Sequence, residues 1–225
     1  MSVLSYSRLS RLRGWCARLR HDSRAFALTE FAIVAPTFVT LGMFGAEVAY
    51  MASIKMQISQ ISLGVADNAA RLGQSDNSGV APTVNESDVT AVLRGAVYQG
   101  ESMGFNAHGR IILSSLEYSD AHAKQYIHWQ RCAGGKNVAS RFGNDGADNG
   151  LGSTPITGMG SGSTPITASS GSAVMFVEVS YDYQKLFPLI PIGQNATFRE
   201  EAALIIRDDR NLTPGLSGTN TSPCT

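Results

Sequence analysis

The chain has 225 residues, of which 43% are hydrophobic, enough for one globular domain and an additional apolar segment. Its formal net charge is zero, but residues 1–25 hold six arginines against the single acidic residue Asp22. The rest of the chain is therefore acidic, which argues against a polyanion-binding face, and we expect no nucleic acid partner.

A basic arm, residues 1–25, leads directly into a long apolar run. Residues 31–46 carry no charge, and the chain is mostly apolar again from Val48 to Ile54. As one helix, residues 31–54 extend about 36 Å, which exceeds the ~30 Å hydrocarbon core of a bilayer. Arginines beside a membrane segment mark its cytoplasmic side. We therefore predict one membrane-spanning helix over residues 26–54, with its N-terminus in the cytoplasm.

A secretory signal peptide has the same basic start and apolar core. Its cleavage favours an Ala-x-Ala sequence, and none occurs between Leu28 and Val65. Release as a soluble exported enzyme would need a cut beyond residue 50. The helical pattern instead continues along one stripe, formed by Val48, Met51, Ile54, Ile58, Ile61, Val65, Ala69 and Leu72. We expect a continuous helix of about 45 residues whose amphipathic second half packs mostly on the protein's own sheet.

For the remaining residues, 55–225, we predict an extracytoplasmic α+β head that continues from this helix. After a turn-rich break at residues 73–83, Asn85 or Ser87 can cap a short helix. Strand patterns then follow at residues 109–118, 124–132, 173–183 and 196–208, so we expect a small, mostly antiparallel sheet. Residues 143–172 are rich in Gly, Ser, Thr and Pro, which predicts a flexible, exposed loop.

Two glutamates, Glu30 and Glu47, lie near the ends of the apolar run, and Pro36 lies inside it. An unpaired ionisable group in a membrane costs about 3 kcal/mol, so such groups are usually functional. We expect Glu47 near the far interface, where its carboxylate reaches the lipid headgroups. Glu30 needs a positive partner: Arg24 lies six residues earlier, whereas a cut after Ala25 creates a free α-amine. The other interpretation is a hydrated Glu30 with little effect.

The stretch RAFALTEFAIVAP, residues 24–36, resembles the start of TadE-like proteins, the pseudopilins of tight-adherence (Flp-type) pilus systems. The residues that match the family pattern are Ala25, Glu30, Phe31, Pro36 and Glu47. The resemblance implies that a prepilin peptidase cuts between Ala25 and Phe26 and that Glu30 is the assembly glutamate. Ala25 stands where the family usually has glycine, to which it is the nearest residue in size. The helix-then-sheet order and residues 181–193 are similar to the family's body.

The exported part of the chain holds an even pair of cysteines, Cys132 and Cys224, whereas Cys16 lies in the basic arm. A disulfide between them closes a loop of about 90 residues and stabilises the fold by roughly 4–5 kcal/mol on the chain-entropy model. We favour this pairing in an oxidising compartment over two free thiols.

Signals for chemistry are weak. His122 and His128 lie six residues apart with no carboxylate at ligand spacing, so we expect no metal site there. Asp145 and Asp148 lack the order of a calcium loop. No nucleophile lies in a recognisable frame, and we expect neither a cofactor nor an enzyme.

These observations predict a single-pass protein of the bacterial inner membrane, with its head in the periplasm or outside the cell. By resemblance it is a minor pseudopilin that assembles through its N-terminal helix, inside or beside the pilus. Its partners would be the prepilin peptidase, other pilins, the inner-membrane assembly platform and membrane lipid. The alternative is an uncleaved bitopic envelope protein whose head binds a ligand or partner.

Overall fold

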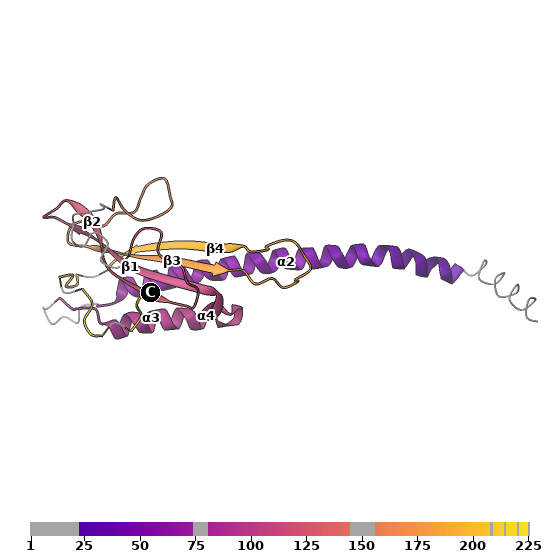
Figure 1. Ribbon diagram of the computed structural model, residues 1–225, viewed down its shortest axis with the longest axis horizontal. Coiled ribbons are helices and arrows are strands. Elements are labelled where there is room, and N and C mark those ends of the chain that lie inside the picture. The colour runs from indigo at the N-terminus through magenta and orange to yellow at the C-terminus, as the bar shows by residue number, and fades with distance from the viewer. Residues whose placement is uncertain are drawn as a thin grey trace, which may run out of the picture. The chain divides into compact units, whose positions relative to one another are not determined.

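The computed structural model describes residues 23–73, 81–144, 156–207, 209–213, 215–219 and 221–224. Its helices are α2 (Ser23–Arg71), α3 (Glu86–Gln99), the 3-10 turn η1 (Glu101–Met103) and α4 (Phe105–His108). Its strands are β1 (Gly109–Ser119), β2 (Lys124–Ala133), β3 (Ala173–Asp182) and β4 (Thr197–Ile205). Figure 1 shows these elements along the chain. The long apolar helix, the short helices and the antiparallel sheet confirm the predicted α+β class.

Contacts divide the chain into two units. The first contains α2 as far as Ala49 together with the loop Phe187–Ile190. The second, called the head below, contains Tyr50–Leu186 and Pro191–Thr225. The head therefore begins at Tyr50, whereas the sequence placed its start at residue 55. The reason is that Tyr50, Met51 and Ile54 all pack in its hydrophobic core.

Helix α2 is continuous for 49 residues, close to the predicted length. Pro36 lies inside it and cannot donate the backbone hydrogen bond to Ala32, yet the helix continues on both sides. The Thr40 hydroxyl donates to the Pro36 carbonyl at 2.7 Å. Membrane helices tolerate such a proline. Pro36 is thus compatible with an unbroken rod.

Inside the head, the second half of α2 and the short helix α3 cover one face of the sheet. The predicted stripe is buried there from Ile54 to Ala69, with Ile54, Ile58 and Ile61 at 2% exposure or less, whereas its first residue, Val48, is 52% exposed. Val89 and Leu93 of α3 pack into the same core. This core also takes the side chains of β1 and β3 that point to the helices, namely Ile111, Leu113, Met175, Val177 and Val179. The amphipathic half of α2 therefore finds its partner within its own chain, as expected.

The strands pair antiparallel throughout, in the order β2-β1-β3-β4. β1 and β2 form the predicted hairpin, which Ser119 and Lys124 close. The register shifts between Ser115 and Leu116: Ser115 pairs with Trp129 and Leu116 with Ile127. His128 is therefore the extra residue of a β-bulge. A bulge re-aims side chains, and here it brings β2 side chains to a buried carboxylate described below.

The other face of the sheet carries a smaller core, which includes Leu116, Val174 and Phe176. The described part of the Gly/Ser/Thr/Pro-rich segment, residues 156–172, lies on it. Met159 is fully buried there and Ala168 is buried as well, whereas residues 161–167 are exposed. The expectation of an exposed loop is therefore corrected for Met159 and Ala168, because apolar side chains of the segment cover this face. Residues 145–155 lie outside the described residues.

Candidate functional site

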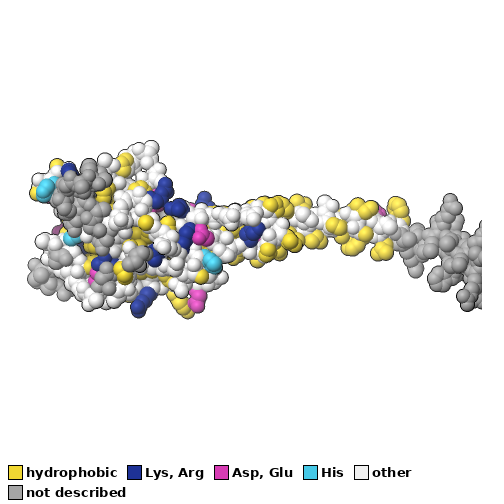
Figure 2. Space-filling model, in the orientation of Figure 1, with side chains coloured by type: hydrophobic (Ala, Val, Ile, Leu, Met, Phe, Trp, Pro, Cys, Tyr) yellow, Lys and Arg dark blue, Asp and Glu magenta, His cyan; other side chains and the backbone are white. Residues whose placement is uncertain are grey.

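The N-terminal part of α2 presents large apolar side chains on all sides. Exposed fractions run from 60% to 75% for Phe26, Leu28, Phe31, Ile33, Phe38, Val39 and Leu41. Figure 2 shows these hydrophobic side chains in yellow along the helix. Covering each one lowers the free energy by about 1.5–3 kcal/mol, so together they demand lipid or other helices. Among the described residues, α2 is the one helix long and apolar enough to cross a membrane.

The side chains of α2 begin to be buried in the head soon after Val48. Val48 is 52% exposed, but Ile54 is 2% exposed and belongs to the core of the head. A helix over residues 26–48 is about 35 Å long, enough to cross the ~30 Å hydrocarbon core. These residues, which lie within the predicted span 26–54, are therefore long enough by themselves to cross a membrane.

Glu30 lies one turn into this apolar segment. Its side chain is exposed, and beside it Phe26 is 74% and Phe31 is 69% exposed. Within the described part of the chain no hydrogen bond or ion pair to its carboxylate is found. One helical turn separates it from Phe26, about 6 Å along the axis. A positive charge at the N-terminus of a chain beginning at Phe26 would thus lie within about one helical turn of the depth of Glu30 in a membrane.

Glu47 has the opposite environment. Its side chain is fully buried, and its Oε2 accepts the backbone N–H of Phe187 at 2.9 Å. The expectation that this carboxylate reaches lipid headgroups is therefore corrected: it turns inward and holds the Phe187–Ile190 loop. Buried carboxylates require such donors, because an unsatisfied buried charge is strongly unfavourable. The two glutamates therefore lie in different environments.

The predicted cleavage site lies at the start of the described chain. Phe26 is described and exposed, whereas for Ala25 the structure gives only its place in α2. The basic arm before Ser23 lies outside the described residues.

In the head, Cys132 and Cys224 are joined by a disulfide across 92 residues. The bond fixes the C-terminal tail beside β2 and α3. The Cys132 N–H donates to the Ser222 carbonyl at 2.9 Å, and the Glu86 N–H donates to the Ser217 carbonyl at 2.9 Å. The tail thus connects the first turn of α3 to the end strand of the sheet.

A buried ion pair lies beneath this tail. Arg131 of β2 donates through Nε to Glu86 Oε2 at 2.9 Å, and its Nη2 binds the other carboxylate oxygen. Glu86 is 4% and Arg131 is 7% exposed. A bidentate geometry of this kind fixes the orientation of both groups. The pair therefore holds α3 against β2 where the tail crosses them.

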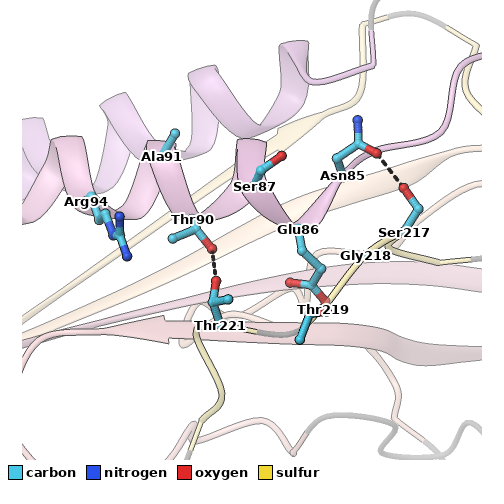
Figure 3. Close-up of a pocket in the computed structure, with 10 residues that line it drawn as sticks. All are labelled: Asn85, Glu86, Ser87, Thr90, Ala91, Arg94, Ser217, Gly218, Thr219 and Thr221. Carbon is cyan, nitrogen blue, oxygen red and sulfur yellow. Dashed lines mark hydrogen bonds between the residues drawn. The ribbon is translucent and has the colours of Figure 1, made fainter.

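An open groove of about 540 Å³ runs between α3 and the tail. Figure 3 shows its lining of hydroxyl groups, with Thr90 bonded to Thr221 at 2.8 Å and Ser217 bonded to Asn85 at 2.5 Å. Arg94 lines it from α3 and is exposed. The lining can hydrogen-bond a polar or anionic group. It contains no nucleophile–base pair that would point to catalysis.

The bulge in β2 creates a polar cluster that sequence reasoning missed. Glu117 of β1 is 2% exposed, and its Oε2 receives both the Tyr126 hydroxyl and His128 Nδ1 at 2.9 Å. Burial, and then the Glu117 charge, raise the pKa of Tyr126. Burial also lowers the pKa of the nearby Arg210 to about 10, an effect that Glu117 opposes. Alternation along β1 indicated that Glu117 faces inward with Leu113, but the bulge had no sequence signal.

The histidines considered for metal binding have other partners. His128 contacts Glu117, and His122 Nδ1 lies 3.2 Å from the Ser119 hydroxyl. The described residues contain no group of three or more His, Cys, Asp or Glu side chains placed to hold a metal ion. Asp145 and Asp148 lie outside the described residues.

Comparison of the chain with protein-family models, with curated proteins and with solved structures found no match. The features that bear on function are the exposed apolar helix with Glu30 near its start, the buried Glu47, and the disulfide-bonded head.

Proposed function

We propose that the protein is a minor pseudopilin of a tight-adherence (Flp-type) pilus or secretion system, anchored in the inner membrane and processed by a prepilin peptidase. Its apolar helix holds it in the membrane and then packs with the helices of other pilins on the assembly platform. The proposal is supported by the match of residues 24–36 to the TadE-like pattern and by the helix-then-sheet order of the fold.

The observation that carries the proposal is the contrast between the two glutamates. Glu47 is buried and accepts a backbone N–H, whereas Glu30 is exposed on the apolar surface without a described partner. A carboxylate at this depth is favourable only when a positive group satisfies it. The α-amine of a neighbouring subunit that begins at Phe26 supplies that charge. The pair would disfavour wrong helix registers more than it adds stability.

Small residues on the same helix support close packing with other subunits. Gly42, Ala46 and Ala49 recur at helical spacing and are exposed. A Cβ added at Gly42 would meet no atom within 4 Å. Nothing in the subunit itself therefore requires glycine there. Small residues let membrane helices approach closely, which suits a contact with another chain.

Intact-mass measurement of the protein from cells that contain the peptidase tests the proposal. We expect a mature chain that begins at Phe26 and lacks the basic arm. Ala25→Gly should be cleaved at least as well, whereas Ala25→Leu should accumulate with the arm attached. A native protein that always begins at Met1 would exclude the pseudopilin function.

The same measurement separates the alternative, an uncleaved bitopic envelope protein. The groove beside Arg94 favours this second candidate, because its hydroxyl and guanidinium lining suits a polar ligand. An intact Met1 start, together with an unimpaired membrane anchor, would support it.

A further inference from the structure

The Phe187–Ile190 loop belongs to the same unit as the exposed part of α2. Two observations fix it there. The Phe187 N–H donates to the buried Glu47 carboxylate at 2.9 Å, and the Ile190 side chain is only 5% exposed. The Ile190 N–H also donates to the Phe187 carbonyl at 3.2 Å, which closes a tight turn. The loop is therefore attached to the helix at one defined level.

The tip of this turn is apolar and faces outward. Leu189 is 91% exposed, the highest value among the large hydrophobic side chains described. The surrounding sequence, residues 186–191, reads LFPLIP and contains no charged or hydrogen-bonding side chain. Burying an exposed Leu side chain lowers the free energy by about 1.5–3 kcal/mol. Contact of the Leu189 side chain with an apolar environment is therefore favourable.

The level of the loop matches a membrane boundary. Glu47 follows Phe26 by 21 residues, about 32 Å along a helix, which is the ~30 Å hydrocarbon thickness. With Phe26 at the inner edge of the hydrocarbon core, Glu47 and the loop attached to it lie at the outer interface. Apolar side chains at this depth bind the boundary between headgroups and acyl chains.

We infer that the Phe187–Ile190 loop is a second membrane contact, in which Leu189 inserts into the outer leaflet while Glu47 holds the loop at that depth. This inference rests on the membrane-spanning part of the proposed function and is independent of cleavage and assembly. The buried Glu47 carboxylate holds the loop at one position along the helix. This position sets how deep the loop lies in the membrane.

Spin-label accessibility in vesicles tests this contact. The full-length Cys16→Ser protein, with its Cys132–Cys224 disulfide intact, is labelled in turn at Leu189→Cys, Ile33→Cys and Ser163→Cys. Ser163 is exposed and serves as the aqueous reference. In phosphatidylethanolamine–phosphatidylglycerol vesicles, we expect the label at 189 to be several-fold less accessible to a water-soluble nickel complex than the label at 163. Its accessibility to oxygen, which concentrates in lipid, should be several-fold higher.

The label at position 33 shows whether a negative result concerns the loop contact or the membrane span itself. If position 33 is in lipid while position 189 is as accessible to nickel as 163, the loop contact is wrong and the membrane span stands. If position 33 is also accessible to nickel, the span itself is wrong. Protection of position 189 from both nickel and oxygen would place Leu189 against protein, such as a second copy of the chain, and would likewise overturn the inference.

Discussion

Glu30→Gln is expected to leave the protein inserted in the membrane but to abolish its co-purification with other pilin subunits. The substitution keeps the size of the side chain and removes its charge, so the amine of the neighbouring subunit loses its partner in low dielectric. Removing one member of a buried ion pair costs about 3–5 kcal/mol, which corresponds to roughly a hundredfold or greater loss of association. Cross-linking and affinity capture from solubilised membranes measure this loss.

Two matched variants separate charge from other effects. Glu30→Asp keeps the carboxylate and should retain a measurable part of the association. Asp67→Asn removes another carboxylate from the same helix, but Asp67 pairs with Arg71 at 3.0 Å and with Arg207 inside the head. It should therefore assemble normally. Normal capture of Glu30→Gln would show that Glu30 is a hydrated group without a role in assembly.

Removal of the Cys132–Cys224 disulfide is expected to have the largest effect on stability. The bond closes a loop across 92 residues, for which the chain-entropy model gives about 4–5 kcal/mol. We expect Cys132→Ser with Cys224→Ser to lower the free energy of unfolding of the head by about this amount. Pulse proteolysis in urea, applied to the full chain in lipid nanodiscs, measures the change.

The local consequence should appear at the tail. The Cys132 N–H donates to the Ser222 carbonyl at 2.9 Å, directly beside the disulfide. Without the disulfide, this hydrogen bond should open more often, so the Cys132 amide hydrogen should exchange faster with deuterated water. Cys16→Ser, which changes a cysteine of the basic arm, is the control and should leave both measurements unaltered. An unchanged unfolding midpoint in the double variant would mean that the bond does not constrain the unfolded chain.

Most of the fold could be predicted from periodic patterns of apolar residues in the sequence. The stripe through Ile54, Ile58 and Ile61 predicted which face of α2 is buried, because spacings of three and four place residues on one side of a helix. The strands were found from short apolar runs between turn residues. The antiparallel pairing of β1 with β2 followed from the short connection at residues 120–123, which only a hairpin satisfies.

Features that depend on contacts between distant residues were not predictable. The partner of Glu47 could not be recognised in the sequence, since the Phe187 N–H that donates to it lies 140 residues later. The bulge at His128 has no local signal, so the Glu117 cluster was missed. The packing of Tyr50 in the head was not predicted, because Tyr50, like Met51 and Ile54, is equally suited to lipid and to a protein core.

The most direct test is a spacer-free cross-link made in assembled material with dicyclohexylcarbodiimide, which joins an amine to a carboxylate only where they touch. Assemblies that mix isotope-labelled and unlabelled subunits should yield a peptide pair in which the α-amine of Phe26 is bonded to Glu30 of the other isotope. Failure to recover that link from assembled subunits, or its occurrence only within single chains, would contradict the pairing of a newly formed N-terminus with the neighbouring Glu30.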